Sequence, residues 1–117
     1  MNTDEIARAF SGHRFEETFD SLAPDAVWHL VGQARLEGRE AIVAACRGTT
    51  EETAAAETAW LRLVSTGDGS VVAVDAIGRY SGPEGVSVVS SCDVYEFADG
   101  RITAITSYAV ELPHEPE

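Results

Sequence analysis

Hydrophobic residues near the start of the chain recur every three or four positions, the spacing of helices with one buried face. A first helix is predicted from Thr3, a residue type that caps helices, to Ser11, with Ile6 and Phe10 on its apolar face. A second helix is predicted over residues 14–22, where three large apolar residues keep the same spacing. The chain therefore begins with two short amphipathic helices.

A strand and a further helix are predicted next. Residues 26–31, with the sequence AVWHLV, are rich in β-branched and aromatic residues, and Gly32 closes the run. A third helix is predicted over residues 39–47, with Ile42 facing the core. The polar, alanine-rich segment 48–56 either extends this helix or forms a mobile flap, and the sequence leaves both open.

In the second half of the chain polar and apolar residues alternate, which is the period of a strand. Four strands joined by tight turns are predicted, at residues 57–66, 71–80, 86–97 and 101–110. Helices followed by a meander of strands predict an α+β fold with a mostly antiparallel sheet. We expect one domain over residues 1–112 and an acidic tail over 113–117.

The same alternation assigns side chains to faces of the sheet. Asp93 shares a face with Tyr95 and Phe97, so its carboxylate is expected to lie inside. The expected core residues are Phe15, Phe19, Leu61, Leu63 and Phe97. Trp60 and Val64 are expected on the outer face, as an apolar patch covered by a second copy of the chain. Asp75 and Arg79 are expected to form a solvated pair on that face.

The amino-acid composition limits the classes of partner that the protein is expected to bind. The 117 residues include 20 acidic and 8 basic ones, for a net charge of -12, which disfavours binding to nucleic acid or anionic membranes. Cys46 and Cys92 are expected to be free thiols. No signal peptide or membrane-spanning stretch is recognisable, so a cytoplasmic location is expected.

Two long passages, FEETFDSLAPDAVWHLVGQARLEGREAI and DVYEFADGRITAITSYAV, resemble the nuclear transport factor 2-like superfamily. The nearest likeness is to its SnoaL-like polyketide cyclases and ketosteroid isomerases. The resemblance implies a cystatin-like cone, in which a curved antiparallel sheet wraps around the N-terminal helices. It also implies an apolar pocket for a small hydrophobic molecule, and a homodimer formed through the outer sheet face.

The resemblance also assigns roles residue by residue. Asp93 matches the protonated aspartic acid with which ketosteroid isomerases stabilise an oxyanion, and His29 matches their general base. Their oxyanion tyrosine corresponds to a position near Ile6, which argues against steroid isomerisation by that route. Ser107 matches the last aspartate of limonene epoxide hydrolases, which argues against epoxide hydrolysis.

The candidate catalytic residues are His29 and Asp93, and the candidate substrate-binding residues are Trp28, Ser91, Tyr95 and Ser107. For His29 the alternative is a core histidine bonded to a backbone carbonyl. For Asp93 the alternative is a carboxylate that holds the sheet together through Ser91 or Ser107.

Two functions remain open. One is a cofactor-independent isomerase or cyclase that moves protons on a small carbonyl compound. The other is a non-catalytic module that binds a small hydrophobic ligand or serves as a dimeric accessory protein. The histidines show no metal-ligand spacing and no nucleotide motif is present, so no metal or cofactor is expected.

Overall fold

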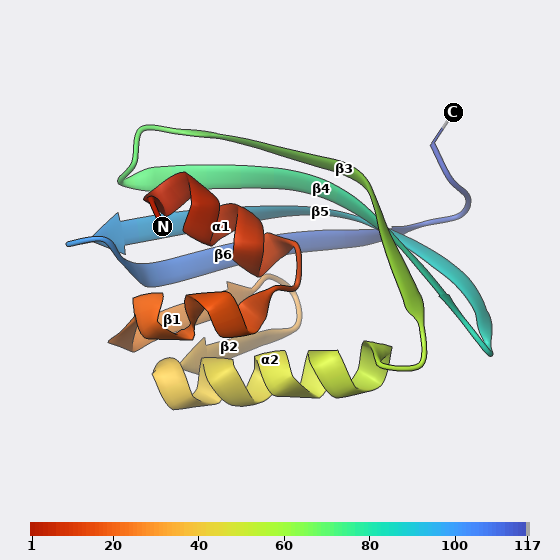
Figure 1. Cartoon of the computed structure of the whole chain (residues 1–117), viewed down its shortest axis with the longest axis horizontal. Coiled ribbons are helices and arrows are strands. Elements are labelled where there is room, and N and C mark those ends of the chain that lie inside the picture. Colours follow the sequence, from red (N-terminus) through yellow and green to blue (C-terminus); the bar gives the residue numbers. More distant parts are fainter. Residues whose placement is uncertain (117) are drawn as a thin grey trace.

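The computed structural model describes residues 1–116 (Figure 1). Its elements, in chain order, are α1 (Thr3–Ser11), the 3-10 helix η1 (Phe15–Ser21), β1 (Leu22–Leu30), β2 (Ala34–Glu37), α2 (Arg39–Thr53), β3 (Glu57–Gly67), β4 (Val71–Gly82), β5 (Gly85–Ala98) and β6 (Arg101–Leu112). None of the helices in this described part is both long and apolar enough to span a membrane.

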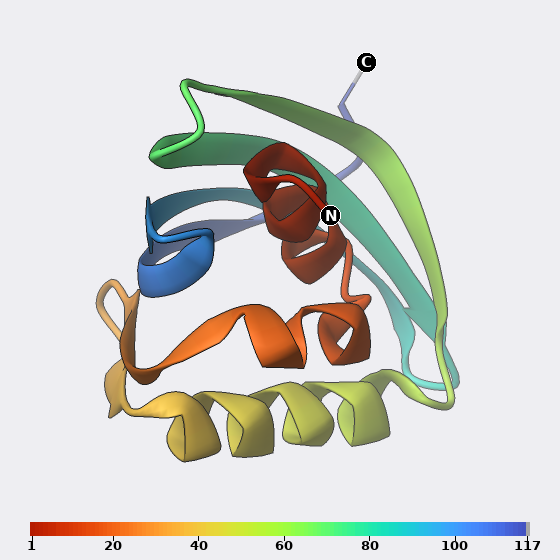
Figure 2. The same ribbon diagram turned by 60° about the vertical axis from the view of Figure 1, so that its left-hand side comes forward.

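The strands form one six-stranded sheet in the order β2-β1-β6-β5-β4-β3. Every neighbouring pair is antiparallel except β1 and β6, which run parallel. The sheet curls around α1, while α2 packs against β1 and β2 (Figure 2). The predicted α+β class, with a curved sheet wrapped around the N-terminal helices, is confirmed.

The helices differ from the predictions in detail. Asn2 caps α1, one residue before the predicted cap, because its side chain accepts a hydrogen bond from the Glu5 amide while the Glu5 carboxylate accepts one from the Asn2 amide. The second helix is a 3-10 helix over Phe15–Ser21. The open question about residues 48–56 is answered by α2, which continues to Thr53.

One strand boundary and one whole strand were also missed. The first strand begins at Leu22 and runs through Pro24, four residues before the predicted start. The short strand β2 was not predicted; it pairs with the end of β1 as a hairpin and forms the edge of the sheet. Proline is tolerated in β1 because the parallel ladder with β6 is interrupted between Leu22 and Val27.

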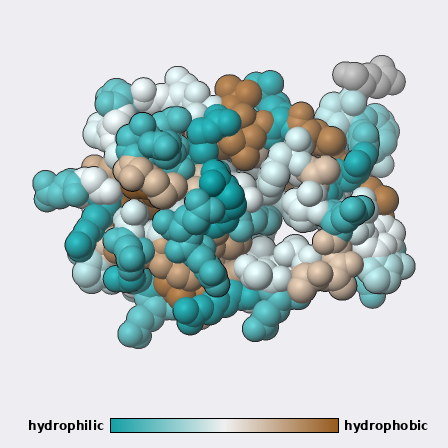
Figure 3. All heavy atoms as spheres, in the orientation of Figure 1, coloured by the Kyte–Doolittle hydropathy of each residue, from teal (hydrophilic) through white to brown (hydrophobic). Residues whose placement is uncertain are grey.

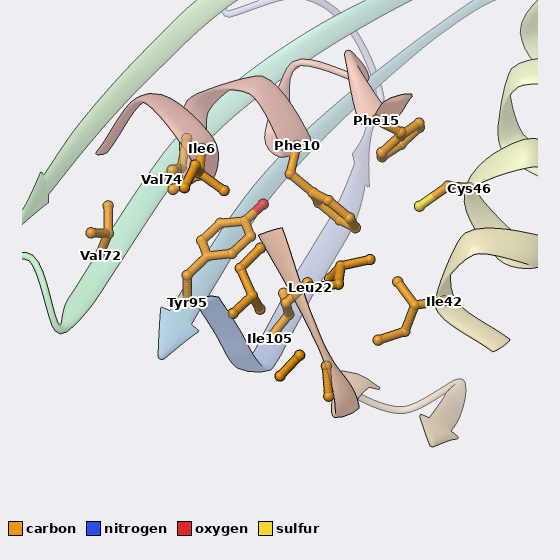
Figure 4. Packing of buried hydrophobic residues seen from close by; sticks show 14 residues of the cluster. Ile6, Phe10, Phe15, Leu22, Ile42, Cys46, Val72, Val74, Tyr95 and Ile105 are labelled. Atoms are coloured by element: carbon orange, nitrogen blue, oxygen red, sulfur yellow. The ribbon is translucent and has the colours of Figure 1, made fainter. Parts of the chain in front are cut away.

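Hydrophilic residues predominate on the face that carries α1 and α2, and the hydrophobic residues visible there form separate patches (Figure 3). Inside, side chains from both helices and from the concave face of the sheet form one core (Figure 4). Its largest fully buried members are Tyr95, Phe10, Leu22, Ile42, Ile102 and Ile105. Both cysteines are free, as expected, and burial raises the pKa of the Cys46 thiol to about 12.

A β-bulge at Leu61 overturns part of the predicted face assignment. Trp60 pairs with Gly78 and Arg62 with Ile77, so Leu61 is an extra residue with no partner of its own. The bulge changes the phase of the strand, which leaves Leu61 42% exposed and places both Trp60 and Leu63 on the inner face. Leu61 was therefore wrongly predicted as a core residue, and Trp60 as an outer one.

The other expected core residues do pack together, since Phe15 is buried and Phe19, Leu63 and Phe97 pack partly buried against the same core. Asp75 and Arg79 both face outward, as predicted, but they do not pair with each other. Asp75 accepts a hydrogen bond from Arg62 at 2.9 Å, and Arg79 donates one to Glu115 at 2.6 Å. Glu115 belongs to the expected tail, whose last residue, Glu117, lies outside the described residues.

The two leucines that differ most in surroundings offer a matched test of the core and of the bulge. We expect Leu22→Ala to lower the free energy of unfolding by about 2–5 kcal/mol, because it leaves a cavity in the core. We expect Leu61→Ala to lower it by less than about 1 kcal/mol, because that side chain is largely in solvent. Urea unfolding of both variants measures this, and equal losses would contradict the bulged register.

Candidate functional site

A cavity of about 210 Å³ lies between α1, α2 and the concave face of the sheet. Rings and aliphatic side chains form most of its wall, and a few polar groups from α1, α2 and the central strands complete it. The lining residues are Phe10, Ser11, His13, Phe15, Trp28, Leu30, Thr49, Trp60, Tyr80, Val89, Ser91, Asp93, Ser107 and Ala109.

The carboxyl group of Asp93 is held from both sides by serine hydroxyls. Ser11, the last residue of α1, donates to Oδ2 at 2.7 Å. Ser107 lies directly across from Asp93 on β6 and donates to Oδ1 at 2.6 Å. Both serines are buried, so these hydrogen bonds are shielded from competing water.

Two aromatic side chains extend this network. The indole Nε1 of Trp28 donates to Ser107 Oγ at 2.9 Å. The Tyr95 hydroxyl lies 2.7 Å from Ser11 Oγ and is directed toward α1 (Figure 4). Because the single proton of Ser11 is given to Asp93, the Tyr95 hydroxyl must donate to Ser11. Four donors therefore point, directly or through a serine, at one carboxyl group.

Burial is the largest influence on the charge of Asp93. It raises the pKa of the carboxyl above its ordinary value, and the hydrogen bonds from Ser107 and Ser11 only partly oppose this. Among the described residues Asp93 takes part in no salt bridge. Burial and the nearby Asp93 charge also raise the pKa of Tyr80, and that of Tyr95 well above its usual range, so both phenols keep their protons.

An aromatic cluster encloses another part of the cavity. The His13 ring stacks on the Phe15 ring, with 5.0 Å between their centroids, and on the Tyr80 ring, with 6.0 Å. The Trp60 ring meets the His13 ring edge-on, with 5.1 Å between their centroids. Gly78 makes room for the cluster, because a β-carbon there would lie 2.9 Å from Trp60 Cζ3 and 3.0 Å from the Tyr80 hydroxyl. The absence of a side chain at Gly78 on β4 therefore allows the Trp60 and Tyr80 rings to pack together in the cavity wall.

Two larger hollows adjoin the cavity. One, of about 520 Å³, lies between η1 and α2 and shares His13 and Phe15 with it. The other, of about 610 Å³, lies at the β4–β5 turn and shares Tyr80. Their remaining walls are mostly charged, small or turn residues, so the smaller inner cavity is the better candidate site.

A family model described as the SnoaL-like domain matches residues 4–105. The chain belongs to the SnoaL-like domain family. The resemblance inferred from the sequence is thereby confirmed, and no curated protein matches the chain.

Solved structures agree with this SnoaL-like assignment. An NTF2-like protein of unknown function from Cytophaga hutchinsonii is 24% identical, with a TM-score of 0.78 over 91% of this chain and 94% of that one. A candidate polyketide cyclase from Sinorhizobium meliloti is 25% identical, with a TM-score of 0.64 over 89% and 94% of the two chains. A ketosteroid isomerase-like fold from Catenulispora acidiphila, in complex with trimethylamine, is 18% identical, with a TM-score of 0.61 over 77% and 70%.

Within this SnoaL-like cone, four of the six candidate residues lie on the cavity wall: Trp28, Ser91, Asp93 and Ser107. Tyr95 does not line the cavity. It is completely buried behind Asp93 and supports Ser11 instead. Tyr95 was therefore misplaced as a candidate for direct substrate contact.

The two candidate catalytic residues do not lie together, because Asp93 lines the cavity and His29 does not. His29 pairs with Thr106 on β6, while its neighbour Trp28 pairs with the inward-facing Ile105. Because side chains alternate along a strand, Trp28 points into the cone and the exposed His29 points to the outer face. A catalytic role for His29 inside this cavity has no geometric basis.

His13 lines the cavity, although it was not predicted as a site residue. His13 follows α1 in a left-handed backbone conformation with φ of 62°, which turns the chain toward η1. Burial lowers the pKa of its imidazole, which favours the neutral ring. The available signal was its place directly after the Ser11-Gly12 helix end. Among the residues described, no cluster of three potential metal ligands is present.

The raised pKa of Asp93 predicts a specific dependence of stability on pH. Between the ordinary aspartate pKa of about 3.9 and the raised value, the folded protein binds more protons than the unfolded chain. The stabilisation from this extra proton is complete when the pH is below the pKa of Asp93 in the unfolded chain. It is lost as the pH rises through the pKa of Asp93 in the folded protein. We therefore expect wild type to lose stability relative to Asp93→Asn as pH rises above about 4, until the carboxyl is ionised in the folded protein as well.

Urea unfolding of both proteins at a series of pH values measures this difference. At pH values well below 4 the aspartate is protonated in both states, so the difference there should not vary and serves as the internal control. A wild type that gains stability relative to the variant as pH rises would show that the carboxyl is ionised more readily in the folded state.

Proposed function

We propose that this SnoaL-like domain binds a small, largely apolar carbonyl compound in the cavity and moves a proton on it without a cofactor. The observation that supports this most directly is the Asp93 carboxyl, which lies on the wall of an aromatic cavity with no cationic partner among the described residues. A carboxylate whose pKa is raised is a stronger base than an ordinary aspartate, which suits it to taking a proton.

The proposed chemistry is removal of a proton next to the carbonyl group. The Asp93 carboxylate takes the proton from carbon, and the electrons of the broken C–H bond move onto the carbonyl oxygen. The Tyr80 hydroxyl, which keeps its proton and also lines the cavity, donates a hydrogen bond to that oxygen. The proton then returns from Asp93 to another carbon or to the same one, so no redox partner is needed.

The size of the cavity limits the ligand. At about 210 Å³ it lies below the roughly 300–1,000 Å³ typical of pockets for drug-sized molecules. A monocyclic or small bicyclic compound therefore suits it better than a steroid. The likeness to a candidate polyketide cyclase supports carbonyl chemistry, and the trimethylamine-bound neighbour supports only that such a cone can enclose a small molecule.

A non-catalytic binding module is the second candidate, because specific features favour it. Both carboxyl oxygens of Asp93 already accept hydrogen bonds from serines, and His29 is outside the cavity. Ile6, at the place matched to the family's oxyanion tyrosine, is buried in the core. In this alternative Asp93 orients a ligand and turns nothing over.

Hydrogen–deuterium exchange distinguishes the two candidates. In heavy water, with a panel of small cyclic ketones and 1,3-diketones, we expect the wild type to accelerate exchange at carbon next to the carbonyl. Asp93→Asn should reduce that acceleration by about a hundredfold or more, because the amide cannot take the proton. NMR follows the exchange on each ketone.

The matched control is Asp75→Asn, which removes an exposed carboxylate on the outer face and should leave the rate unchanged. Exchange that survives in Asp93→Asn would rule out Asp93 as the base. Ketones that shift the NMR signals of cavity residues but never exchange would favour the binding module.

We also propose that the chain forms a homodimer through the outer face of its sheet. Val64, Tyr108 and Val110 are between 47% and 63% exposed there, on β3 and β6. Their register with Asp75, Cys92 and Ser90 places all three on the convex face. Burying such an apolar surface against a second copy would be favourable.

Light scattering tests this assembly. We expect a dimer at micromolar concentration and a monomer for Tyr108→Glu, because a buried unpaired charge would weaken the interface strongly. Circular dichroism of the variant checks that the fold is retained. A monomeric wild type at the same concentration would refute the proposal.

A further inference from the structure

The cavity around Asp93 combines two features that together suit a positively charged ligand. Six of its lining side chains are aromatic rings: Phe10, His13, Phe15, Trp28, Trp60 and Tyr80. They come from α1, the turn after it, η1 and three different strands, so rings surround the space rather than cover one wall. Such an enclosure is the arrangement in which proteins bind alkylated ammonium groups.

The second feature is the uncompensated carboxyl. Asp93 is the only carboxyl group on the cavity wall, and no lysine or arginine is among the lining residues described. Its hydrogen-bond partners are neutral serines. An ionised carboxylate buried in this way lacks a counter-ion, and a cationic ligand would supply one.

The net charge of the whole chain also favours a positively charged ligand. With 20 acidic and 8 basic residues, the protein carries a net charge of -12 and attracts cations toward its surface. In the cavity, contacts with the faces of the aromatic rings and with the Asp93 carboxylate would replace the water molecules that hydrate the cation. A neutral molecule of the same shape would gain only the apolar contacts.

We propose that the cavity selects a small carbonyl compound that carries a trialkylammonium group next to the carbonyl, with the ammonium enclosed by the rings and paired with Asp93. This inference rests on the proposed function for the carbonyl group and adds the charge of the substrate. The positive nitrogen also makes the neighbouring C–H more acidic, which suits a carboxylate, a weak base. When that bond breaks, the proton goes to Asp93 and the electron pair to the carbonyl oxygen, which leaves a zwitterionic ammonium enolate intermediate with no net charge. Asp93 then returns the proton to carbon, so the carboxylate is regenerated.

Two compounds of the same shape isolate the effect of charge. Acetonyltrimethylammonium carries a permanent positive charge, and 4,4-dimethyl-2-pentanone has carbon in place of its nitrogen. By calorimetric or NMR titration at constant ionic strength, we expect the cation to bind wild type at least about tenfold more tightly than its neutral counterpart. The preference should increase as pH rises and Asp93 ionises.

Two variants separate the contributions of the carboxylate and the rings. Asp93→Asn should remove most of the preference for the cation, while Trp60→Leu should weaken the cation more than the neutral ketone. Asp75→Asn, the exposed outer-face control, should change neither affinity. Since a substituted cavity residue can affect folding, each variant is first compared with wild type by urea unfolding.

The outcomes distinguish this inference from the proposed function. Equal affinity for the two compounds, or a preference that Asp93→Asn leaves undiminished, overturns the inference even if neutral ketones exchange protons. A clear preference for the cation without any exchange supports the charge selectivity and overturns proton transfer. Binding of the cation at the outer face, seen as NMR shifts away from the cavity residues, also overturns the inference.

Discussion

The need to satisfy one buried carboxyl group governs how this domain is arranged. Asp93 accepts hydrogen bonds from Ser11 at the end of α1 and from Ser107 on β6, so a helix and two strands must meet at one point. Trp28 and Tyr95 then satisfy or support those serines. Removing either serine would leave part of a buried acid without a partner, a costly state, and this fixes where α1 can end.

The space beside that carboxyl depends on an irregular part of the sheet. The bulge at Leu61 turns Trp60 inward, and the bare Gly78 opposite it leaves room for the Trp60 and Tyr80 rings. A regular strand would have placed Trp60 in solvent and removed one wall of the cavity. The cavity is therefore shaped by two backbone features as much as by the side chains that line it.

Alternation along the strand was enough to place Asp93 and Ser91 inside, because β5 is regular in that stretch and pairs with β6 residue by residue. It failed for Trp60, since a bulge cannot be read from residue types alone. His29 was chosen by its match to a family position, although alternation next to Trp28 allows only one of the two to face the cavity. His13 was missed because its position depends on a left-handed turn and on contacts with distant rings.

The parallel pairing of β1 with β6 has a consequence for how the domain reaches its native state. Trp28 lies on β1, whose parallel neighbour is β6, far away in the sequence. Ser107 also lies on β6. During synthesis the ribosome must release every residue from β1 through β6 before Asp93 gains its second hydroxyl partner. Such distant pairings slow folding and leave strand edges open meanwhile, so the nascent chain is most vulnerable to aggregation until its final segment docks.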